Sequence, residues 1–150
     1  MRQGIERDEF MLHYQPQIDI PSGRIIGFEA LVRWRHPQRG LVMPDTFISI
    51  AEESGLIVAL GQWILREACH QNARWQQAAL PAVRMAVNLS GAQLRREGLY
   101  DAILAALAES GLRPQMLELE LTESLLIHDI EHNLRLLADL KALGVHLAVD

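Results

Sequence analysis

The sequence predicts an α/β fold built mainly on parallel strands, and three features of the pattern predict it. From Val83 onward the segments alternate as strand, helix, strand, helix, strand, which is the order of parallel strands joined by helical crossovers. Asn88, Glu120 and Asp150 stand near the ends of those three strands and recur about every 30 residues, the length of one strand–helix repeat. Before Val83 the chain begins with two strands joined by a short turn.

The first half of the chain predicts a hairpin followed by two helices. The segment 10–34 reads as two strands around the turn "IPSGR", in which proline and glycine supply the turn geometry. A loop is expected from His36 to Pro44, and a short helix over 45–55 closed by Gly55. A longer helix is expected over 56–78, because apolar residues recur along one side at helical spacing: Ile57, Leu60, Ile64, Ala68 and Trp75.

The second half predicts three strands and two helices. Strands are expected over 83–90, 115–124 and 145–150, with helices over 100–111 and 129–144. Asp129 is a candidate N-cap of the last helix. The total is five strands, whereas a closed strand–helix barrel typically needs eight strands and about 250 residues. An open doubly wound sheet needs fewer strands, although a hairpin start fits it less well. On either interpretation the architecture looks unfinished.

Composition limits the class of protein. The chain has 150 residues, of which 49% are hydrophobic and 22% charged, as expected for one globular domain. The apolar runs are too short to span a bilayer and the start lacks a signal sequence, so a cytoplasmic location is expected. The net charge of −5 argues against binding polymeric nucleic acid, but not against one small phosphate ligand. Cys69, the only cysteine, excludes an internal disulfide and is expected to be a buried, inert thiol.

Polar residues interrupt strands that should be almost entirely apolar. They are Glu29, Asn88, Glu118, Glu120 and Asp150. A buried carboxylate must be protonated, paired or bound to metal, and side chains at equal heights on adjacent strands can converge on one ion. Oxygen ligands of this kind suit Mg²⁺, Mn²⁺ or Ca²⁺. The alternative is an amphipathic strand with its glutamates in solvent and a capping Asp150, and spacing alone leaves both open.

Two other groups of residues have competing interpretations. Arg33 follows Glu29 by four residues, and it could form a structural ion pair with Glu29 or Glu52 or hold a phosphate. His128 and His132 are better explained as surface or capping residues than as a metal pair. The sequence contains neither a Walker loop nor a GxGxxG motif.

The ordered series of motifs resembles the EAL domain family. "HYQPQID" is followed by "GFEALVRWRHPQRGLVMPDTFISIAEESGLI", and then by "AVNLS", "LELELTES" and "HLAVD". The three letters Glu-Ala-Leu are weak by themselves, but five motifs in the family's order are highly specific. The resemblance runs from about Phe10 to Asp150, so 1–150 would be a partial EAL domain with residues 1–9 as a lead-in helix or linker.

The resemblance implies a fold, a reaction and a site. The fold would be a modified TIM (β/α)8 barrel with an antiparallel first strand, of which this chain holds about the first five strands. The activity would be hydrolysis of cyclic di-GMP to linear pGpG with two Mg²⁺ or Mn²⁺ ions. Matched residue by residue, the metal ligands would be Glu29, Asn88, Glu120 and Asp150. Glu123 would anchor the loop after the next strand, and Arg33 would hold a phosphate. The residues that would lie along the nucleotide are Gln15, Leu31 and Pro44.

The sequence also departs from the family pattern. It ends before the second aspartate of the Asp-Asp-Phe-Gly motif, and the family's later glutamate and glutamine are absent. Its only lysine, Lys141, lies in a helical segment and does not match the catalytic lysine. The intact domain is therefore expected to be active and this fragment inactive.

The resemblance leaves other roles and partners open. The alternatives to an enzyme are a catalytically silent cyclic di-GMP receptor or regulatory module, and a scaffold that binds no nucleotide. A homodimer is expected, attached to a sensory or cyclase domain, and the chain could be the cytoplasmic part of a larger membrane-bound protein.

Overall fold

The computed structural model describes residues 1–150, and its elements follow the predicted order with two additions, β3 and α4. Helix α1 lies in the segment expected to lead into the domain. In chain order the elements are α1 (Arg2–Glu6), β1 (Phe10–Ile18), β2 (Ile25–His36), β3 (Gly40–Val42), α2 (Pro44–Ser54), α3 (Ile57–Gln77), β4 (Arg84–Asn88), α4 (Gly91–Arg95), α5 (Leu99–Ser110), β5 (Leu117–Leu121), α6 (Ile130–Leu143) and β6 (His146–Val149), with 3₁₀ turns at Pro114–Met116 and Glu123–Leu126.

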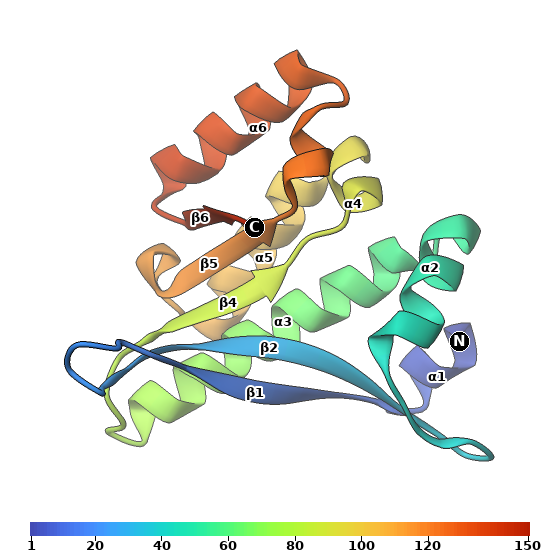
Figure 1. The fold of residues 1–150 in the computed structure, drawn as a ribbon, viewed down its shortest axis with the longest axis horizontal. Coiled ribbons are helices and arrows are strands. Elements are labelled where there is room, and N and C mark those ends of the chain that lie inside the picture. Colours follow the sequence, from blue (N-terminus) through green and yellow to red (C-terminus); the bar gives the residue numbers. More distant parts are fainter.

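One mixed sheet organises the molecule (Figure 1). Its strands are ordered β1-β2-β4-β5-β6. Strand β1 is antiparallel to β2, whereas β2, β4, β5 and β6 are all parallel. The parallel strands and the antiparallel first strand confirm the predicted fold class. Strands β1 and β6 each keep one unpaired edge, so the sheet is not closed into a barrel within this chain.

The prediction that 36–44 is a loop is wrong. Gly40–Val42 forms β3, which pairs antiparallel with Trp34–His36 at the end of β2. Gly40 has a φ of 71°, and glycine adopts this left-handed geometry without strain. A strand of three residues has too little periodicity to be recognised, and its pairing with β2 defines it. The strand count is therefore six instead of five.

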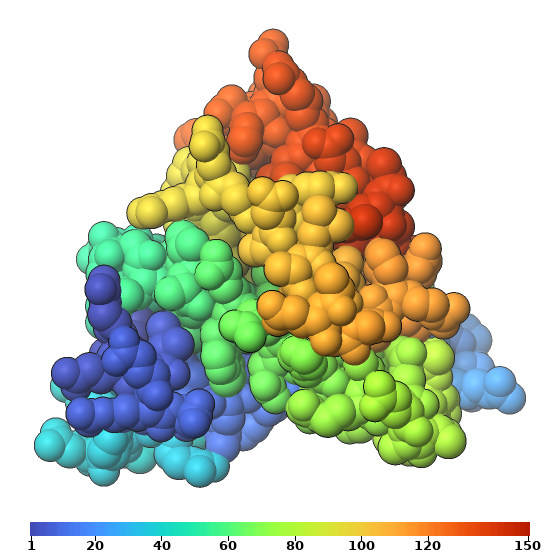
Figure 2. Space-filling model, turned by 180° about the vertical axis from the view of Figure 1, so that it is seen from behind, coloured from blue at the N-terminus to red at the C-terminus, as the bar shows by residue number.

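The main core lies between the sheet and helices α3 and α5. Alternate residues of β5 point to this side, so Leu117, Leu119 and Leu121 are buried together with Met85 and Val87 of β4. In the view of Figure 1 these two helices lie behind the sheet, and Figure 2 shows them side by side from the opposite face. The sheet face that these helices do not cover therefore carries the intervening polar residues of the strands.

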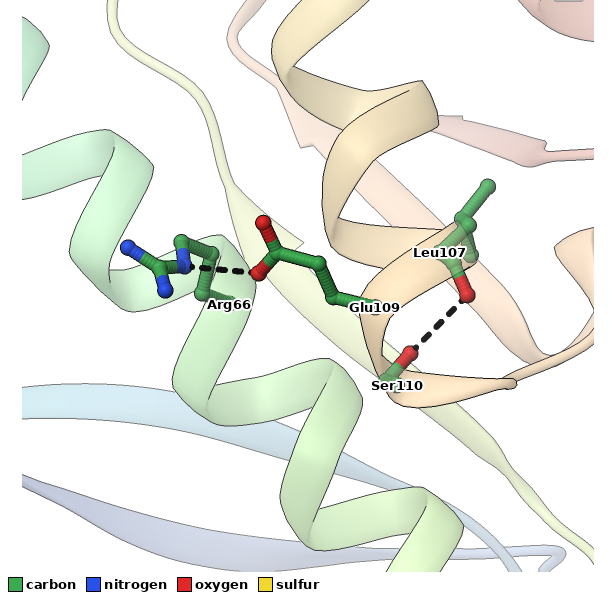
Figure 3. Close-up of polar contacts among 4 residues, drawn as sticks. All are labelled: Arg66, Leu107, Glu109 and Ser110. Atoms are coloured by element: carbon green, nitrogen blue, oxygen red, sulfur yellow. Dashed lines mark hydrogen bonds and ion pairs between the residues drawn. The ribbon is translucent and has the colours of Figure 1, made fainter.

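One exposed ion pair also joins helices α3 and α5 (Figure 3). The Arg66 guanidinium donates from Nε to Oε2 of Glu109 over 3.0 Å, and both side chains are largely in solvent. At the end of α5 the Ser110 hydroxyl donates to the Leu107 carbonyl. An exposed pair of this kind contributes at most about 1 kcal/mol, so apolar packing holds the two helices together.

Two helix starts differ from the sequence interpretation. The unpredicted α4 begins at a capping box in which the Ser90 hydroxyl accepts from the Gln93 amide, and the Gln93 side chain accepts from the Ser90 amide. The pattern Ser-x-x-Gln was a signal for it. Asp129 does occupy the N-cap of α6, but with a φ of 52° its side chain makes no capping bond.

Cys69 is fully buried in α3, which confirms the expected burial, and this burial raises the pKa of its thiol to about 12. None of the helices is both long enough and apolar enough to cross a membrane.

Candidate active site

The uncovered face of the sheet gathers polar side chains at the carboxyl ends of β4 and β5. Asn88 and Glu120 stand opposite each other in the register of these strands. This equal height was predicted from their spacing. It follows because parallel strands end at the same edge of a sheet, so their last residues become neighbours.

Glu29 and Asp150 lie at different heights from that pair. Glu29 pairs with Ala86, so it stands in the middle of β2 and not at its end. Strand β2 continues beyond Glu29 to His36, where it pairs with β3. Asp150 comes two residues after Ala148, the register partner of Glu120. The long side chain of Glu29 nevertheless reaches the site, where its Oε1 accepts a hydrogen bond from Asn88 Nδ2 over 3.0 Å.

Glu120 is the most perturbed acidic group of the site. It is 8% exposed, and its pKa is raised from 4.5 to about 7. Burial is the largest cause of this rise in pKa, followed by the neighbouring Glu29 carboxylate and then by the charges of Asp150 and Glu118. Negative groups therefore converge on a carboxyl with little access to water. Such an arrangement favours either a proton or a bound cation.

Gln17 is a site residue that the sequence analysis did not single out. Its Nε2 donates to Glu120 Oε1 over 3.4 Å. Gln17 stands opposite Gly27 in the β1–β2 register, and a Cβ at Gly27 would lie 2.8 Å from the Gln17 amide oxygen. A side chain at position 27 would therefore collide with the Gln17 amide, and glycine leaves room for Gln17 to reach Glu120. The period of two in β1 was the available signal, since it places Gln17 on the same face as Gln15.

Glu118 has a structural partner one layer below Glu120. Its Oε2 lies 3.7 Å from Nη1 of Arg84 at the start of β4. Glu118 therefore has a structural partner within the protein and does not face open solvent. The two glutamates of β5 therefore have different surroundings, since one faces a cation of the protein and the other faces carboxylates.

A cavity of about 340 Å³ adjoins these residues. Four of the predicted site residues line it, and they come from β2, the start of α2, β4 and β5: Leu31, Pro44, Asn88 and Glu120. Further walls come from α4 and from the segment after β5. Most of the lining is apolar or neutral, with a few polar groups among it, as is typical of a small-molecule site.

The remaining predicted residues lie around the cavity and do not line it. Gln15 stands opposite Glu29 in the β1–β2 register. The Arg33 guanidinium donates to the Val32 carbonyl and makes no ion pair, so the proposed pairing with a glutamate is wrong. The Glu123 amide donates to the Asp150 carbonyl over 3.3 Å, which joins the segment after β5 to the end of β6.

The oxygen donors of this site include groups that could hold a divalent cation. No three His, Cys, Asp or Glu side chains lie close enough together to form a metal site by themselves. Two carboxylates and one amide do converge, and Asn88 leaves its Oδ1 oxygen available because only Nδ2 is engaged with Glu29. Oxygen donors with excess negative charge fit Mg²⁺ or Mn²⁺ better than softer metals.

Replacing Gln17 by methionine tests its contact with Glu120. The variant keeps side-chain length but removes the donor, and activity at limiting metal should fall about tenfold, as for other outer-shell partners of metal ligands. The measurement is a titration with Mn²⁺ of the cyclic di-GMP hydrolysis that the resemblance to EAL domains implies. Gln76→Met is the matched control, because Gln76 donates over the same 3.4 Å to Asn72 Oδ1 on α3. Equal metal dependence in both variants would refute the role of Gln17.

The chain is similar to known proteins over its whole length. The EAL domain family matches residues 1–150. The bifunctional diguanylate cyclase/cyclic di-GMP phosphodiesterase MucR of Pseudomonas aeruginosa is 44% identical over 150 residues, which are all of this chain and 22% of MucR. The cyclic di-GMP phosphodiesterase NbdA of the same organism is 42% identical over the whole chain and 19% of its own length. The chain thus spans about a fifth of these curated relatives.

Solved structures give the same result. The MucR phosphodiesterase in its c-di-GMP complex superposes with a TM-score of 0.95 at 44% identity, over 99% of this chain and 60% of that one. The FimX EAL domain of Pseudomonas aeruginosa bound to c-di-GMP superposes with a TM-score of 0.87 at 27% identity, over 99% of this chain and 59% of that one. With the family match over its full length, this chain belongs to the EAL domain family.

Proposed function

We propose that the domain containing residues 1–150 hydrolyses cyclic di-GMP to linear pGpG. The observation that carries this proposal is the convergence of Glu29, Asn88 and Glu120 beside a cavity lined by Leu31 and Pro44. The relatives MucR and NbdA support it, because each is described as a cyclic di-GMP phosphodiesterase.

The proposed site uses Mg²⁺ or Mn²⁺, two ions by resemblance to the family. Glu29, Asn88, Glu120 and Asp150 would hold them, and the excess negative charge around Glu120 supports this assignment. Bound ions of this kind supply an activated water and stabilise charge on a phosphoryl group. Within the chain, Asn88 orients the Glu29 carboxylate, and Gln17 orients that of Glu120.

The other matched residues are proposed to position the nucleotide. Arg33 has no acidic partner, so its guanidinium is free to bind a phosphate. Gln15 would contact the nucleotide beside Glu29, its register partner, while Leu31 and Pro44 supply apolar surface. Glu123 would anchor the loop after β6, and the bond from its amide to the last residue of the chain supports that location.

A catalytically silent cyclic di-GMP receptor is the second candidate. One observation favours it: the acidic groups of this chain do not assemble a metal site by themselves. The FimX EAL domain bound to c-di-GMP has the same fold over 99% of this chain. Binding of the nucleotide without turnover in the presence of Mg²⁺ and Mn²⁺ would distinguish the receptor from the enzyme.

The function is tested by incubating the full-length protein with cyclic di-GMP and either metal, and by measuring pGpG by chromatography and mass spectrometry. We expect turnover with metal and none with EDTA. Binding without turnover would refute the enzyme and support the receptor. If the protein neither binds nor hydrolyses cyclic di-GMP, both the enzyme and the receptor are refuted and a scaffold is supported. Residues 1–150 alone are expected to be inactive, since this chain covers only 60% of the MucR structure and leaves two sheet edges unpaired.

We also propose a longer parent protein, a second copy as partner and a cellular location. Because the chain matches only a fifth of MucR and NbdA, we infer that it works within a longer protein that carries a sensory or cyclase domain. A second copy is the expected partner, as a homodimer. A cytoplasmic location is proposed because cyclic di-GMP is an intracellular messenger in bacteria.

A further inference from the structure

The segment that joins β5 to α6, residues 122–129, forms one wall of the cavity. Thr122 and Leu125 line the cavity from this segment, and Gly91 lines it from α4. The two walls are in direct contact, since a Cβ at Gly91 would lie only 2.7 Å from Leu125 Cδ2. A small displacement of the 122–129 segment would therefore change the shape of the cavity.

Contacts from within and from outside the segment hold it in place. It contains the 3₁₀ turn Glu123–Leu126, where the Leu125 amide donates to the Thr122 carbonyl over 3.1 Å, and the Thr122 and Ser124 hydroxyls lie 3.2 Å apart. At its far end Asp129 makes no side-chain capping bond. From outside, the Glu123 amide donates to the Asp150 carbonyl over 3.3 Å, and further contacts come from α6.

Asn133, in the second turn of α6, supplies such contacts. Its Nδ2 donates to the carbonyls of Leu125 and His128 over 3.1 and 2.6 Å. The side chain is 2% exposed, and its Oδ1 is buried without a hydrogen-bond partner. A buried acceptor without a partner is unfavourable, so the amide is stabilised here only through its two donors. Both of those donors serve the 122–129 segment.

The neighbouring residue links α6 to the opposite wall. His132 Nε2 lies 3.3 Å from the carbonyl of Leu94, in α4. The start of α6 is thus connected to both segments that enclose this side of the cavity, one through Asn133 and the other through His132.

We propose that Asn133 is a positioning residue for the nucleotide site. By holding the Leu125 and His128 carbonyls, it sets the location of the wall that Thr122 and Leu125 present to the ligand. This inference rests on the proposed function for the identity of the ligand, but the local stability of the wall can be measured without any ligand.

The chain offers a matched control in Asn72. This residue is 1% exposed, and its Nδ2 also donates to two backbone carbonyls, those of Val83 over 3.0 Å and Met116 over 3.4 Å. Both acceptors immediately precede strands, so they lie at the opposite end of the sheet from Asn88 and Glu120. Replacing either asparagine removes two buried donors, but only Asn133 contacts the cavity wall.

The experiment compares Asn133→Ala with Asn72→Ala in the full-length protein. Hydrogen exchange of peptides covering 122–129 reports how firmly the wall is held, and the Kd of cyclic di-GMP in EDTA reports nucleotide binding at the site. We expect both variants to be destabilised. Only Asn133→Ala should accelerate exchange in 122–129 and raise the Kd, each about tenfold, a change that corresponds to the loss of one or two hydrogen bonds.

Each outcome has a definite meaning. Equal exchange over 122–129 in the two variants, or an unchanged Kd in Asn133→Ala, would overturn the inference. Faster exchange combined with no nucleotide binding by the unmodified protein would support Asn133 as the support of the segment and refute the proposed function instead. If Asn133→Ala does not fold, Asn133→Ser and Asn72→Ser replace the pair, because serine keeps one donor and should give a smaller change of the same kind.

Discussion

Replacing Glu29 by alanine is expected to abolish hydrolysis of cyclic di-GMP, lowering kcat/KM by more than about 100-fold. Loss of an outer-shell partner alone costs about 10- to 100-fold, and Glu29 is proposed to contact the ions directly. The substitution also removes the acceptor of the Asn88 amide, so a second proposed ligand loses its orientation. The measurement is the initial rate of pGpG formation at saturating Mg²⁺ or Mn²⁺.

Glu109→Ala is the control, because it removes a carboxylate that lies outside the candidate active site. Glu109 pairs with Arg66 on the exposed surface of α3 and α5, and its loss should change kcat/KM less than about twofold. The thermal stability of Glu29→Ala should be unchanged or higher, because a charge facing Glu120 is gone. A Glu29→Ala protein that keeps more than a tenth of the activity would contradict the assignment of Glu29 as a ligand.

Replacing Glu120 by glutamine should stabilise the metal-free protein at pH 8 while eliminating activity. The fold raises the pKa of Glu120 from 4.5 to about 7, so between these values the folded state binds more protons than the unfolded state. The free energy of unfolding therefore decreases as pH rises through this window, and the loss is complete above about pH 7. Glutamine cannot ionise and should recover roughly 3 kcal/mol at pH 8, but almost nothing at pH 4.

Urea unfolding in EDTA at pH 4 and pH 8 measures this difference. Glu118→Gln is the control from the same strand and face, and since it leaves Glu120 intact it should keep the fall of stability toward pH 8. Added Mg²⁺ should stabilise the unmodified protein at pH 8 more than Glu120→Gln, because a cation compensates for the same charges. Equal stability of Glu120→Gln and the unmodified protein at both pH values would show that ionisation of Glu120 does not destabilise the folded protein.

Much of the fold followed from local sequence pattern. The alternation after Val83 predicted β4, α5, β5, α6 and β6 in order, because apolar periodicity and terminal glycines such as Gly111 and Gly144 are local signals. Strand β3 was missed because three residues carry no period. Helix α4 was missed although its capping box was visible in the letters from Ser90 to Gln93.

The candidate site was only partly predictable. The spacing of Asn88 and Glu120 predicted their pairing, since strand–helix repeats of equal length bring strand ends to one level. The location of Glu29 could not be read in this way, because the length of β2 depends on its pairing with β3. Gln17 and Asn133 were also missed, because each acts through a partner distant in sequence, Glu120 or the carbonyls of the 122–129 segment.

The amino-acid sequence by itself therefore determined the order of the elements, the apolar face of each strand and helix, and the family motifs. Only the tertiary structure decided which polar side chains converge, which glutamate of β5 is paired with Arg84 and which is left among carboxylates, and which residues support the cavity wall. The physical reason is that propensity and periodicity act over a few residues, whereas hydrogen bonds, burial and electrostatic shifts depend on groups that only folding brings together.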